Sequence, residues 1–432
     1  MRNVKLGITG PMSESNFGDF AMFINNVYEL GVNEIVAFSY NKGFSQKIIN
    51  DYLNSYKIKN VEVILKESLD GPEKTNKDIN KKVGYLPFNA PTLTPIDILH
   101  QIDNYSELES NIKEIDVLVV NGGGYFNHLW NNSLWRQDML KKIIAPILVA
   151  NQLNKPIYFT GNSYGPFDQS EEFFNYIFNY IKNVRFGVRD KMYSNVYLSR
   201  IGIDSQKQVF IPDDLFIINN DLLNLPRKEF KDLSNIGKYI AVEIYYPLDE
   251  LKDIIEDLKR FSDEIYSKYG YSIIFLPFDF NNGGMNQGEF LKNNLEHFYL
   301  YDISKTGYLP IEDVAHIIKQ AELVFCTRYH ALVLAVGQGT PVINMMKKVC
   351  NDHRYYFNKN YGILQYVFEG IQFNEMDFIK RDLVETLEYL EENILNVINS
   401  QKQVFNNKRY SENLTTLRNK RLNYLDNILN RK

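Results

Sequence analysis

The sequence predicts an α/β protein with two domains, each built on a parallel sheet. The chain has 432 residues, which is more than one typical domain contains. Short apolar strands alternate with helical stretches, as in parallel sheets with crossover helices. The alternation stops at a polar segment, residues 219–237, and then begins again. We therefore expect a linker in that segment.

The first predicted domain spans residues 1–225. Its expected strands are Val4–Ile8, Glu34–Phe38, Val61–Leu65, Val117–Val120, Ile157–Thr160 and Val184–Val188. Residues 71–95 are rich in Lys, Asn and Pro and show little periodicity, which predicts a long insertion. A flap over a cleft and a disordered surface loop are the two interpretations of this insertion.

The second predicted domain spans residues 237–380. Its expected elements are a helical stretch, Leu248–Tyr269, and the strands Tyr239–Ile244, Ser272–Pro277, Leu323–Phe325 and Val342–Met345. Residues 381–432 are helical by pattern, with leucines near one face and basic residues such as Arg421 elsewhere. We expect this tail to pack back on the first domain, and contact with a membrane surface is the alternative.

Composition excludes several classes of protein. A hydrophobic fraction of 44% and a charged fraction of 23% are ordinary for a globular protein. The formal net charge of -5 gives no support to nucleic-acid binding. The two cysteines, Cys326 and Cys350, cannot form a disulfide framework. The N-terminus has no signal-peptide apolar core, and no apolar run approaches the about 18 residues that a spanning helix needs. We therefore expect a cytoplasmic protein.

The segment around Arg328 and His330 is the strongest single indication of a ligand site. An apolar strand, residues 323–325, leads into these two residues and then into an apolar helical run. Ligands bind at the carboxyl ends of strands in open parallel sheets, and a helix N-terminus adds partial positive charge there. This combination suits a small anionic ligand. The alternative is an arginine paired with a helix carboxylate and a histidine satisfied in the core.

Glycines 122–124 follow a strongly apolar strand. They would let backbone N–H groups approach a ligand, and a tight turn is the alternative explanation. Their spacing does not match the dinucleotide-binding fingerprint. No Walker-type loop or Gly-x-Ser-x-Gly elbow is present, and no His, Cys or carboxylate group has metal-ligand spacing. We therefore expect no metal and no cofactor.

Several motifs occur along the chain in a defined order, between about Gly7 and Ile343. They are Gly7-Ile8-Thr9-Gly10-Pro11, Asn16-Phe17-Gly18-Asp19, Asn121-Gly122-Gly123-Gly124, Gly161-Asn162-Ser163-Tyr164-Gly165, Val188-Arg189-Asp190, Ile211-Pro212-Asp213-Asp214 and Arg328-Tyr329-His330-Ala331. Together they resemble the polysaccharide pyruvyl transferase family. The resemblance implies two Rossmann-like domains facing across a cleft, as in the glycosyltransferase-B fold. It also implies transfer of a pyruvyl group from phosphoenolpyruvate to a sugar, usually as a cyclic ketal.

The resemblance places the family's motif arginines on Arg189 and Arg328 and its histidine on His330. Phosphoenolpyruvate carries a phosphate and a carboxylate, which the fork of an arginine binds well. Each arginine follows a strand of a different predicted domain, so the pair is expected to clamp one dianion. Pairing of Arg189 with the adjacent Asp190 is the alternative. The resemblance favours His330 as a general acid, and a neutral histidine can also act as a base.

Further residues are assigned to the two sides of the cleft. Gly123 and Gly124 are expected on the donor side, and Asp19 is expected to orient a sugar hydroxyl or to act as a base. Asp213 and Asp214 remain alternative bases. The expected acceptor residues are Asn16, Tyr125, His128, Asn162 and Ser163. Residues 351–355 depart from the family pattern and leave that side of the site open.

The leading hypothesis is a pyruvyl transferase acting on a sugar of a cell-surface polysaccharide or its lipid-linked precursor. A nucleotide-sugar glycosyltransferase on the same scaffold is the first alternative, because a fold does not fix a function. A glycan-binding or assembly protein without activity is the second alternative. The expected partners are phosphoenolpyruvate and the sugar acceptor, with no nucleic acid. Peripheral contact with the inner membrane face and a homo-oligomer are left open.

Overall fold

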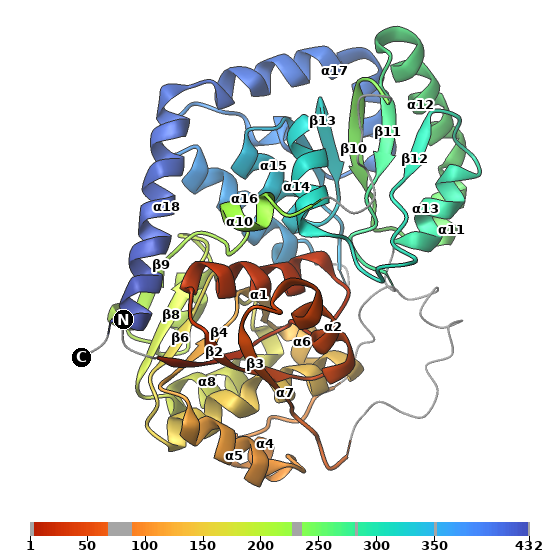
Figure 1. The fold of residues 1–432 in the computed structure, drawn as a ribbon. Coiled ribbons are helices and arrows are strands. Elements are labelled where there is room, and N and C mark those ends of the chain that lie inside the picture. The colour runs from red at the N-terminus through yellow and green to blue at the C-terminus, as the bar shows by residue number, and fades with distance from the viewer. Residues whose placement is uncertain (1–3, 68–88, 227–235, 281–283, 350–351, 431–432) are drawn as a thin grey trace.

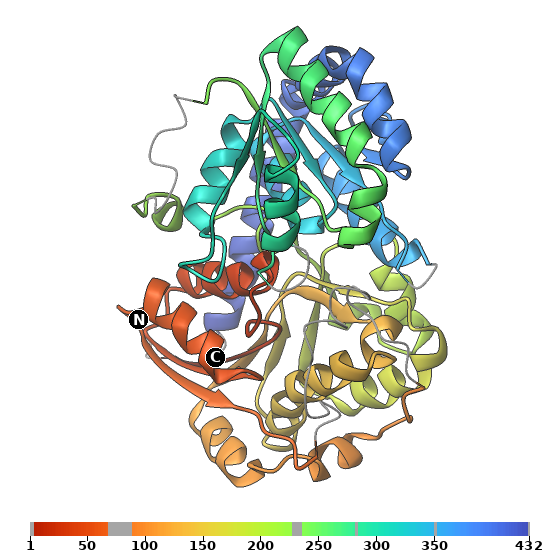
Figure 2. The same ribbon diagram turned by 90° about the vertical axis from the view of Figure 1, so that its right-hand side faces the viewer.

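The computed structural model describes residues 4–67, 89–226, 236–280, 284–349 and 352–430. These residues form two parallel sheets with helices packed on their faces. Figure 1 and Figure 2 show the two sheets stacked one above the other, with the N-terminal half of the chain in the lower layer. The predicted fold class, two Rossmann-like α/β units, is confirmed.

The first sheet has nine strands, in the order β3-β2-β1-β4-β6-β8-β7-β5, with β9 paired to β8. Its strands are β1 (Lys5–Thr9), β2 (Glu34–Ser39), β3 (Lys57–Glu62), β4 (Val117–Val120), β5 (Gly123–Phe126), β6 (Ile157–Phe159), β7 (Asn162–Tyr164), β8 (Val184–Val188) and β9 (Gln208–Phe210). Its helices are α1 (Phe17–Leu30), α2 (Lys42–Tyr52), α4 (Pro95–His100), α5 (Tyr105–Glu114), α6 (His128–Asn131), α7 (Leu134–Gln152), α8 (Glu171–Tyr180), α9 (Ser194–Arg200) and α10 (Asn220–Leu223). The pairings between these strands are all parallel, so the loops after β1, β4 and β8 leave from the same edge.

The second sheet has six strands, in the order β12-β11-β10-β13-β14-β15. Its strands are β10 (Tyr239–Glu243), β11 (Ser272–Phe275), β12 (Phe298–Leu300), β13 (Leu323–Cys326), β14 (Val342–Met345) and β15 (Ile379–Lys380). Its helices are α11 (Leu248–Asp253), α12 (Ile255–Tyr269), α13 (Met285–Lys292), α14 (Ile311–Gln320), α15 (Tyr329–Gln338) and α16 (Arg354–Val367). The central pair, β10 and β13, is buried, as expected for apolar strands covered by helices on both faces.

Two long helices, α17 (Leu383–Phe405) and α18 (Lys408–Leu429), end the chain. Helix α17 packs on α12, and α18 runs along the side of the molecule and packs on α1 and α16 (Figure 1). Arg421, which the sequence pattern placed among the exposed basic residues of the tail, is only 1% exposed. It donates hydrogen bonds to Glu29 and Asp214 of the first half. None of the helices in the described residues has the length and apolarity that a membrane span requires.

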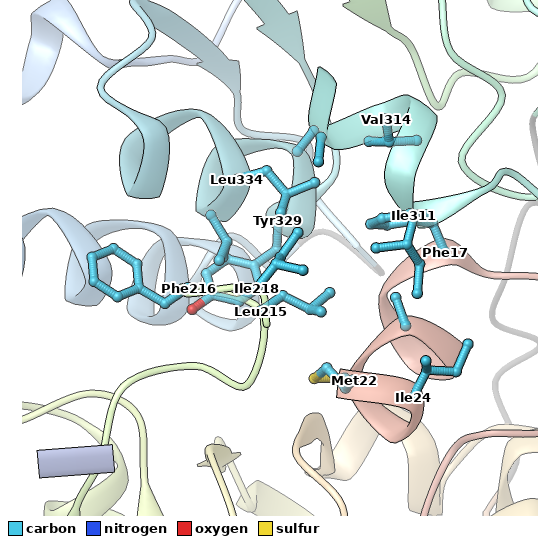
Figure 3. Packing of buried hydrophobic residues seen from close by; sticks show 14 of the residues in the cluster. Phe17, Met22, Ile24, Leu215, Phe216, Ile218, Ile311, Val314, Tyr329 and Leu334 are labelled. Atoms are coloured by element: carbon cyan, nitrogen blue, oxygen red, sulfur yellow. The ribbon is translucent and has the colours of Figure 1, made fainter. Parts of the chain in front are cut away.

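One apolar cluster joins the two halves. Helix α1 contributes Phe17, α14 contributes Ile311, and α15 contributes Leu334. Figure 3 shows these side chains meeting between the layers, together with Leu215 and Phe216 from the segment after β9. Because both sheets bury side chains in this cluster, the halves form one continuous packed interface.

Some elements differ from the sequence prediction. Strand β3 begins at Lys57 rather than Val61, because it is an edge strand that pairs only with β2 and alternates exposed lysines with half-buried residues. Strands β5, β7, β9, β12 and β15 were not expected. Most of the predicted insertion at 71–95, namely residues 71–88, lies outside the described residues. The predicted linker contains a short helix, α10.

Candidate active site

A pocket lies between the two sheets, at the carboxyl ends of their central strands. The first half lines it through the start of α1, through β5 and through the residue that follows β8. The second half lines it through the start of α15 and through α16. The lining residues are Asn16, Asp19, Gly124, Tyr125, Trp130, Arg136, Arg189, Tyr245, Asp279, Arg328, Tyr329, His330, Tyr355, Tyr356 and Lys359. Four of these side chains are cationic types, which makes the pocket suited to an anion.

Arg328 is fixed by the end of strand β10. It is the N-cap residue of α15, and its backbone N–H donates to the Glu243 carboxylate at 2.7 Å. Its Nε lies 3.2 Å from a Glu243 oxygen, and its Nη2 lies 3.8 Å from Asp279. The guanidinium also lies 4.2 Å from the ring centroid of Tyr245. Carboxylates and a ring therefore hold the guanidinium on the wall of the pocket.

Arg189 is the corresponding cation of the first half. Its Nη1 lies 2.5 Å from Asp213, and its Nε donates to the Ser163 hydroxyl at 2.7 Å. The guanidinium lies 4.4 Å from the ring centroid of Tyr329, which belongs to the second half. The carboxylate partner is Asp213 and not Asp190, the partner considered from the sequence. Asp190 instead accepts hydrogen bonds from the backbone N–H groups of residues 193 and 194.

His330 packs directly against helix α1. A Cβ added to Gly18 would lie 1.7 Å from the imidazole Nδ1, so only glycine leaves room for the ring. The Nε2 lies 3.9 Å from Asp213 and has no hydrogen-bond partner among the described residues. Burial, reinforced by Arg189 and then by other nearby cations, lowers the pKa of His330 well below its usual value. The imidazole is therefore neutral at neutral pH.

Asp19 has the opposite protonation behaviour. Its side chain is buried near the carboxylates of Glu14 and Asp279, with Arg136 acting against them. Burial, followed by the Glu14 carboxylate, raises the pKa of Asp19 to about 8. Asp19 therefore carries a proton at neutral pH, whereas His330 does not. Two titratable groups with separated pKa values in one pocket are the usual arrangement for acid and base roles.

Sequence reasoning missed two cationic residues of the pocket. Lys359, on α16, lies 4.1 Å from the ring centroid of Tyr355, and burial followed by Arg189 lowers its pKa well below its usual value. Arg136, on α7, pairs with Glu14 at 2.8 Å. Neither residue belongs to a recognisable motif, since Arg136 is in a helix that is buried over most of residues 136–150 and Lys359 is in an amphipathic helix. Only the fold reveals that they face the pocket.

The structure brings most of the predicted site residues to this pocket and leaves others outside it. Those that line it are Asn16, Asp19, Gly124, Tyr125, Arg189, Arg328 and His330. Gly123 donates its N–H to Gly161 at 3.3 Å, so that amide is already engaged. Ser163 and Asn162 lie behind Arg189 and accept hydrogen bonds from its side chain and its backbone N–H. These three residues shape the pocket wall from behind.

Two candidate residues outside the pocket lining, His128 and Asp214, and the pocket-lining Tyr125 contact other parts of the chain. His128 lies near Asp168 and Asp352 rather than among the pocket-lining residues. Tyr125 is 1% exposed, and its hydroxyl donates to the Asn121 carbonyl at 2.7 Å. Asp214 is buried and accepts hydrogen bonds from Gly122 N–H, Gly161 N–H and Arg421. The Asp214 carboxylate is therefore engaged in hydrogen bonds that hold the strand ends.

Comparisons with known proteins are consistent with this arrangement. The sequence model of the family described as polysaccharide pyruvyl transferase matches residues 16–346. No curated protein matches the chain. Among solved structures, the UDP-GlcNAc 2-epimerase from Neisseria meningitidis bound to UDP-GlcNAc is 10% identical, with a TM-score of 0.58 and coverage of 99% of each chain. Anabaena HepE in complex with UDP and glucose is 9% identical, with a TM-score of 0.57, and covers 99% of this chain and 100% of its own. At these identities the likeness shows the fold alone.

Proposed function

Because the chain belongs to the polysaccharide pyruvyl transferase family, we propose that it moves the pyruvyl group of phosphoenolpyruvate onto two hydroxyls of one sugar. The sugar would belong to a cell-surface polysaccharide or to its lipid-linked precursor, and the products would be a cyclic ketal and phosphate. The observation that carries the proposal is the convergence of Arg189, Arg328 and Lys359 on one pocket with His330. A small dianion with two anionic groups matches such a set of cations.

The donor would be held from both halves. Arg328 and Lys359 come from the second half and Arg189 from the first, so one bound molecule contacts both layers. Burial, followed by the positive charge of Arg189, disfavours the charged form of Lys359 and lowers its pKa well below its usual value. An incoming phosphate would reverse that balance and draw a proton onto the lysine. Donor binding is therefore expected to be coupled to proton uptake.

We assign the acid and base roles from the pKa shifts of Asp19 and His330. Protonated Asp19 gives its proton to the methylene carbon of the donor. The first sugar hydroxyl then attacks the adjacent carbon, and the proton of that hydroxyl passes to His330. The phosphate then leaves and takes the proton from His330. The second sugar hydroxyl attacks the same carbon to close the ring, and its proton passes to Asp19. Each group ends in its starting state. This assignment gives His330 the base role rather than the acid role that the resemblance favoured.

The test is incubation of the chain with phosphoenolpyruvate and a panel of galactosides, glucosides and N-acetylhexosamines. The expected result is a pyruvyl mass gain on one sugar with one phosphate released for each ketal formed. A His330→Gln variant should lose about 10²–10⁴-fold in turnover, the range for a general acid–base group. A matched control, His297→Gln, changes a histidine that stacks on Tyr266 outside the pocket.

Two outcomes would contradict the proposal. Transfer of a sugar from a nucleotide sugar, without use of phosphoenolpyruvate, would show the glycosyltransferase alternative. Sugar binding with no turnover of either donor would show the non-catalytic alternative.

A further inference from the structure

Three side chains converge beside the pocket, at the boundary of the two halves. His128 is the first residue of α6, Asp168 follows β7, and Asp352 lies two residues before α16. The His128 Nε2 is 3.5 Å from an Asp168 oxygen and 3.7 Å from an Asp352 oxygen. One possible ligand atom from each residue lies within 4.8 Å of the other two. Sequence spacing does not reveal this group, because its members come from three distant segments.

The imidazole of His128 is buried and unpartnered. The residue is 8% exposed, and its Nε2 makes no hydrogen bond with the described residues. The distances to the two carboxylates exceed hydrogen-bond length. A buried ring nitrogen without a partner is costly, so a ligand bound to it would stabilise the folded chain.

Arg354 currently balances the two carboxylates. Its Nη2 lies 2.5 Å from Asp168 and 2.7 Å from Asp352. Its side chain is 51% exposed, so it approaches the group from the solvent side. A guanidinium has only hydrogen-bond donors, which satisfy the two carboxylates. It has no empty orbital, so it cannot coordinate the ring nitrogen of His128 as a metal ion would. A metal ion that binds all three residues would therefore compete with Arg354 for the two carboxylates.

We propose that His128, Asp168 and Asp352 form a binding site for a divalent metal ion of the Zn²⁺ type. One imidazole nitrogen and two carboxylate oxygens form a ligand set that Zn²⁺ accepts, with solvent at the fourth position. Tetrahedral ligands at about 2.1 Å from Zn²⁺ lie roughly 3.4 Å apart. The two imidazole–carboxylate separations, 3.5 and 3.7 Å, are close to this value, and the two carboxylate oxygens lie within 4.8 Å of each other.

The site would link the two halves of the molecule. His128 and Asp168 belong to the first half, whereas Asp352 precedes α16, which carries Tyr355, Tyr356 and Lys359 into the pocket. A bound ion would fix the start of α16 relative to β5. It would not contact the donor, because His128, Asp168 and Asp352 are not among the pocket-lining residues. The proposal therefore stands independently of the transferase reaction.

The test is equilibrium dialysis of the full chain against Zn²⁺. We expect one ion bound per chain, with affinity reduced more than tenfold in Asp168→Asn, Asp352→Asn and His128→Gln. Arg354→Gln should bind Zn²⁺ more tightly, because it removes the competing cation. Asp249→Asn, in an exposed ion pair on α11, is the matched control and should bind as the unchanged chain does. Zn²⁺ should also raise the melting temperature of the unchanged chain but not that of His128→Gln.

The test is decisive because the ligand variants should bind Zn²⁺ more weakly and Arg354→Gln should bind it more tightly. If Arg354→Gln bound Zn²⁺ more weakly, or if no stoichiometric ion were taken up, the three residues would be an arginine-centred ion network and the proposal would be overturned. Uptake that none of the three ligand variants reduces would place the ion elsewhere and would overturn it equally. Circular dichroism of each variant without metal separates loss of binding from loss of folding.

Discussion

The contact between Gly18 and His330 explains why the motif residue at position 18 is a glycine. Gly18 lies in the first turn of α1, where its backbone has ordinary helical geometry, so conformational freedom is not the reason for glycine there. The reason is space, since an added Cβ would lie 1.7 Å from the imidazole. The motif glycine therefore lets the His330 imidazole of the second half approach the first half.

Gly18→Ala should consequently displace the imidazole. We expect turnover to fall by at least tenfold, toward the 10²–10⁴-fold that an acid–base group supplies. The measurement is phosphate release per folded chain, with folding checked by circular dichroism. The matched control is Gly43→Ala in α2, where an added Cβ would meet only the Asn41 side chain at 3.5 Å. Normal turnover in Gly18→Ala would show that the position of the ring is irrelevant to the reaction.

The raised pKa of Asp19 predicts a pH-dependent contribution to stability. The folded chain keeps this proton up to about pH 8, whereas an unfolded aspartate loses it near its model value of 3.8. Between these limits the folded state binds more protons, so its free energy of unfolding falls as pH rises, by about 1.4 kcal/mol per unit for one group. Asp19→Asn should remove this fall.

The measurement is urea unfolding of both chains from pH 5 to pH 8. The difference in unfolding free energy, unchanged chain minus Asp19→Asn, should decrease as pH rises. A difference that stays flat would mean that Asp19 ionises normally in the fold.

Residue types in motifs predicted part of the pocket. Arg328, His330 and Asp19 follow strands, and strand ends collect at one edge of a parallel sheet. The partner of Arg189 was not predictable in the same way. Asp190 is its neighbour in sequence, yet its carboxylate accepts the backbone N–H groups of residues 193 and 194 instead. Asp213, 24 positions away, makes the ion pair.

At the scale of elements, apolar runs predicted the central strands, whereas short strands and polar strands were missed. Strand β7 reads Asn-Ser-Tyr and β5 reads Gly-Gly-Tyr-Phe, so neither shows a run of branched residues. They extend the sheet beyond β8, which is where Gly124 enters the pocket wall. Their pairing is set by neighbouring strands and therefore depends on tertiary structure.

Helix α18 is anchored by one buried arginine. Arg421 donates to Asp214 at 2.6 Å, and Asp214 in turn accepts from Gly122 N–H at 2.9 Å and Gly161 N–H at 3.0 Å. The last helix thereby supports two strand ends of the first sheet. Removal of Arg421 would leave the Asp214 carboxylate buried without its ionic partner.

Arg421→Met should therefore lower the free energy of unfolding by about 3–5 kcal/mol, the usual cost of breaking a buried ion pair from one side. The matched control is Arg418→Met on the exposed face of the same helix, which should change stability by less than about 0.5 kcal/mol. Chemical denaturation of the two variants gives both values. Equal effects would show that Asp214 is satisfied without Arg421.

At the scale of the whole molecule, the alternation of strands and helices predicted two α/β halves, and the packing between them was not predictable. Phe17, Leu215 and Ile311 are ordinary apolar residues in sequence, and each would suit the core of a single domain. In the structure they meet in one cluster between the sheets (Figure 3). A sequence shows which faces of its helices and strands are apolar, but it does not show whether the same half or the other half of the chain packs on them.

The shared cluster and the two-sided pocket together predict that the halves unfold as one unit. Calorimetry should show a single transition.

Saturating phosphoenolpyruvate, at 100 times its dissociation constant, should stabilise that transition by about 2.7 kcal/mol. Arg328→Lys keeps the charge but loses the fork that binds an anion through two donors, so the shift should shrink markedly. Arg260→Lys, on the exposed surface of α12, is the matched control and should keep the full shift. Two separate transitions, with only one moved by the donor, would mean that the ligand is held by one half alone.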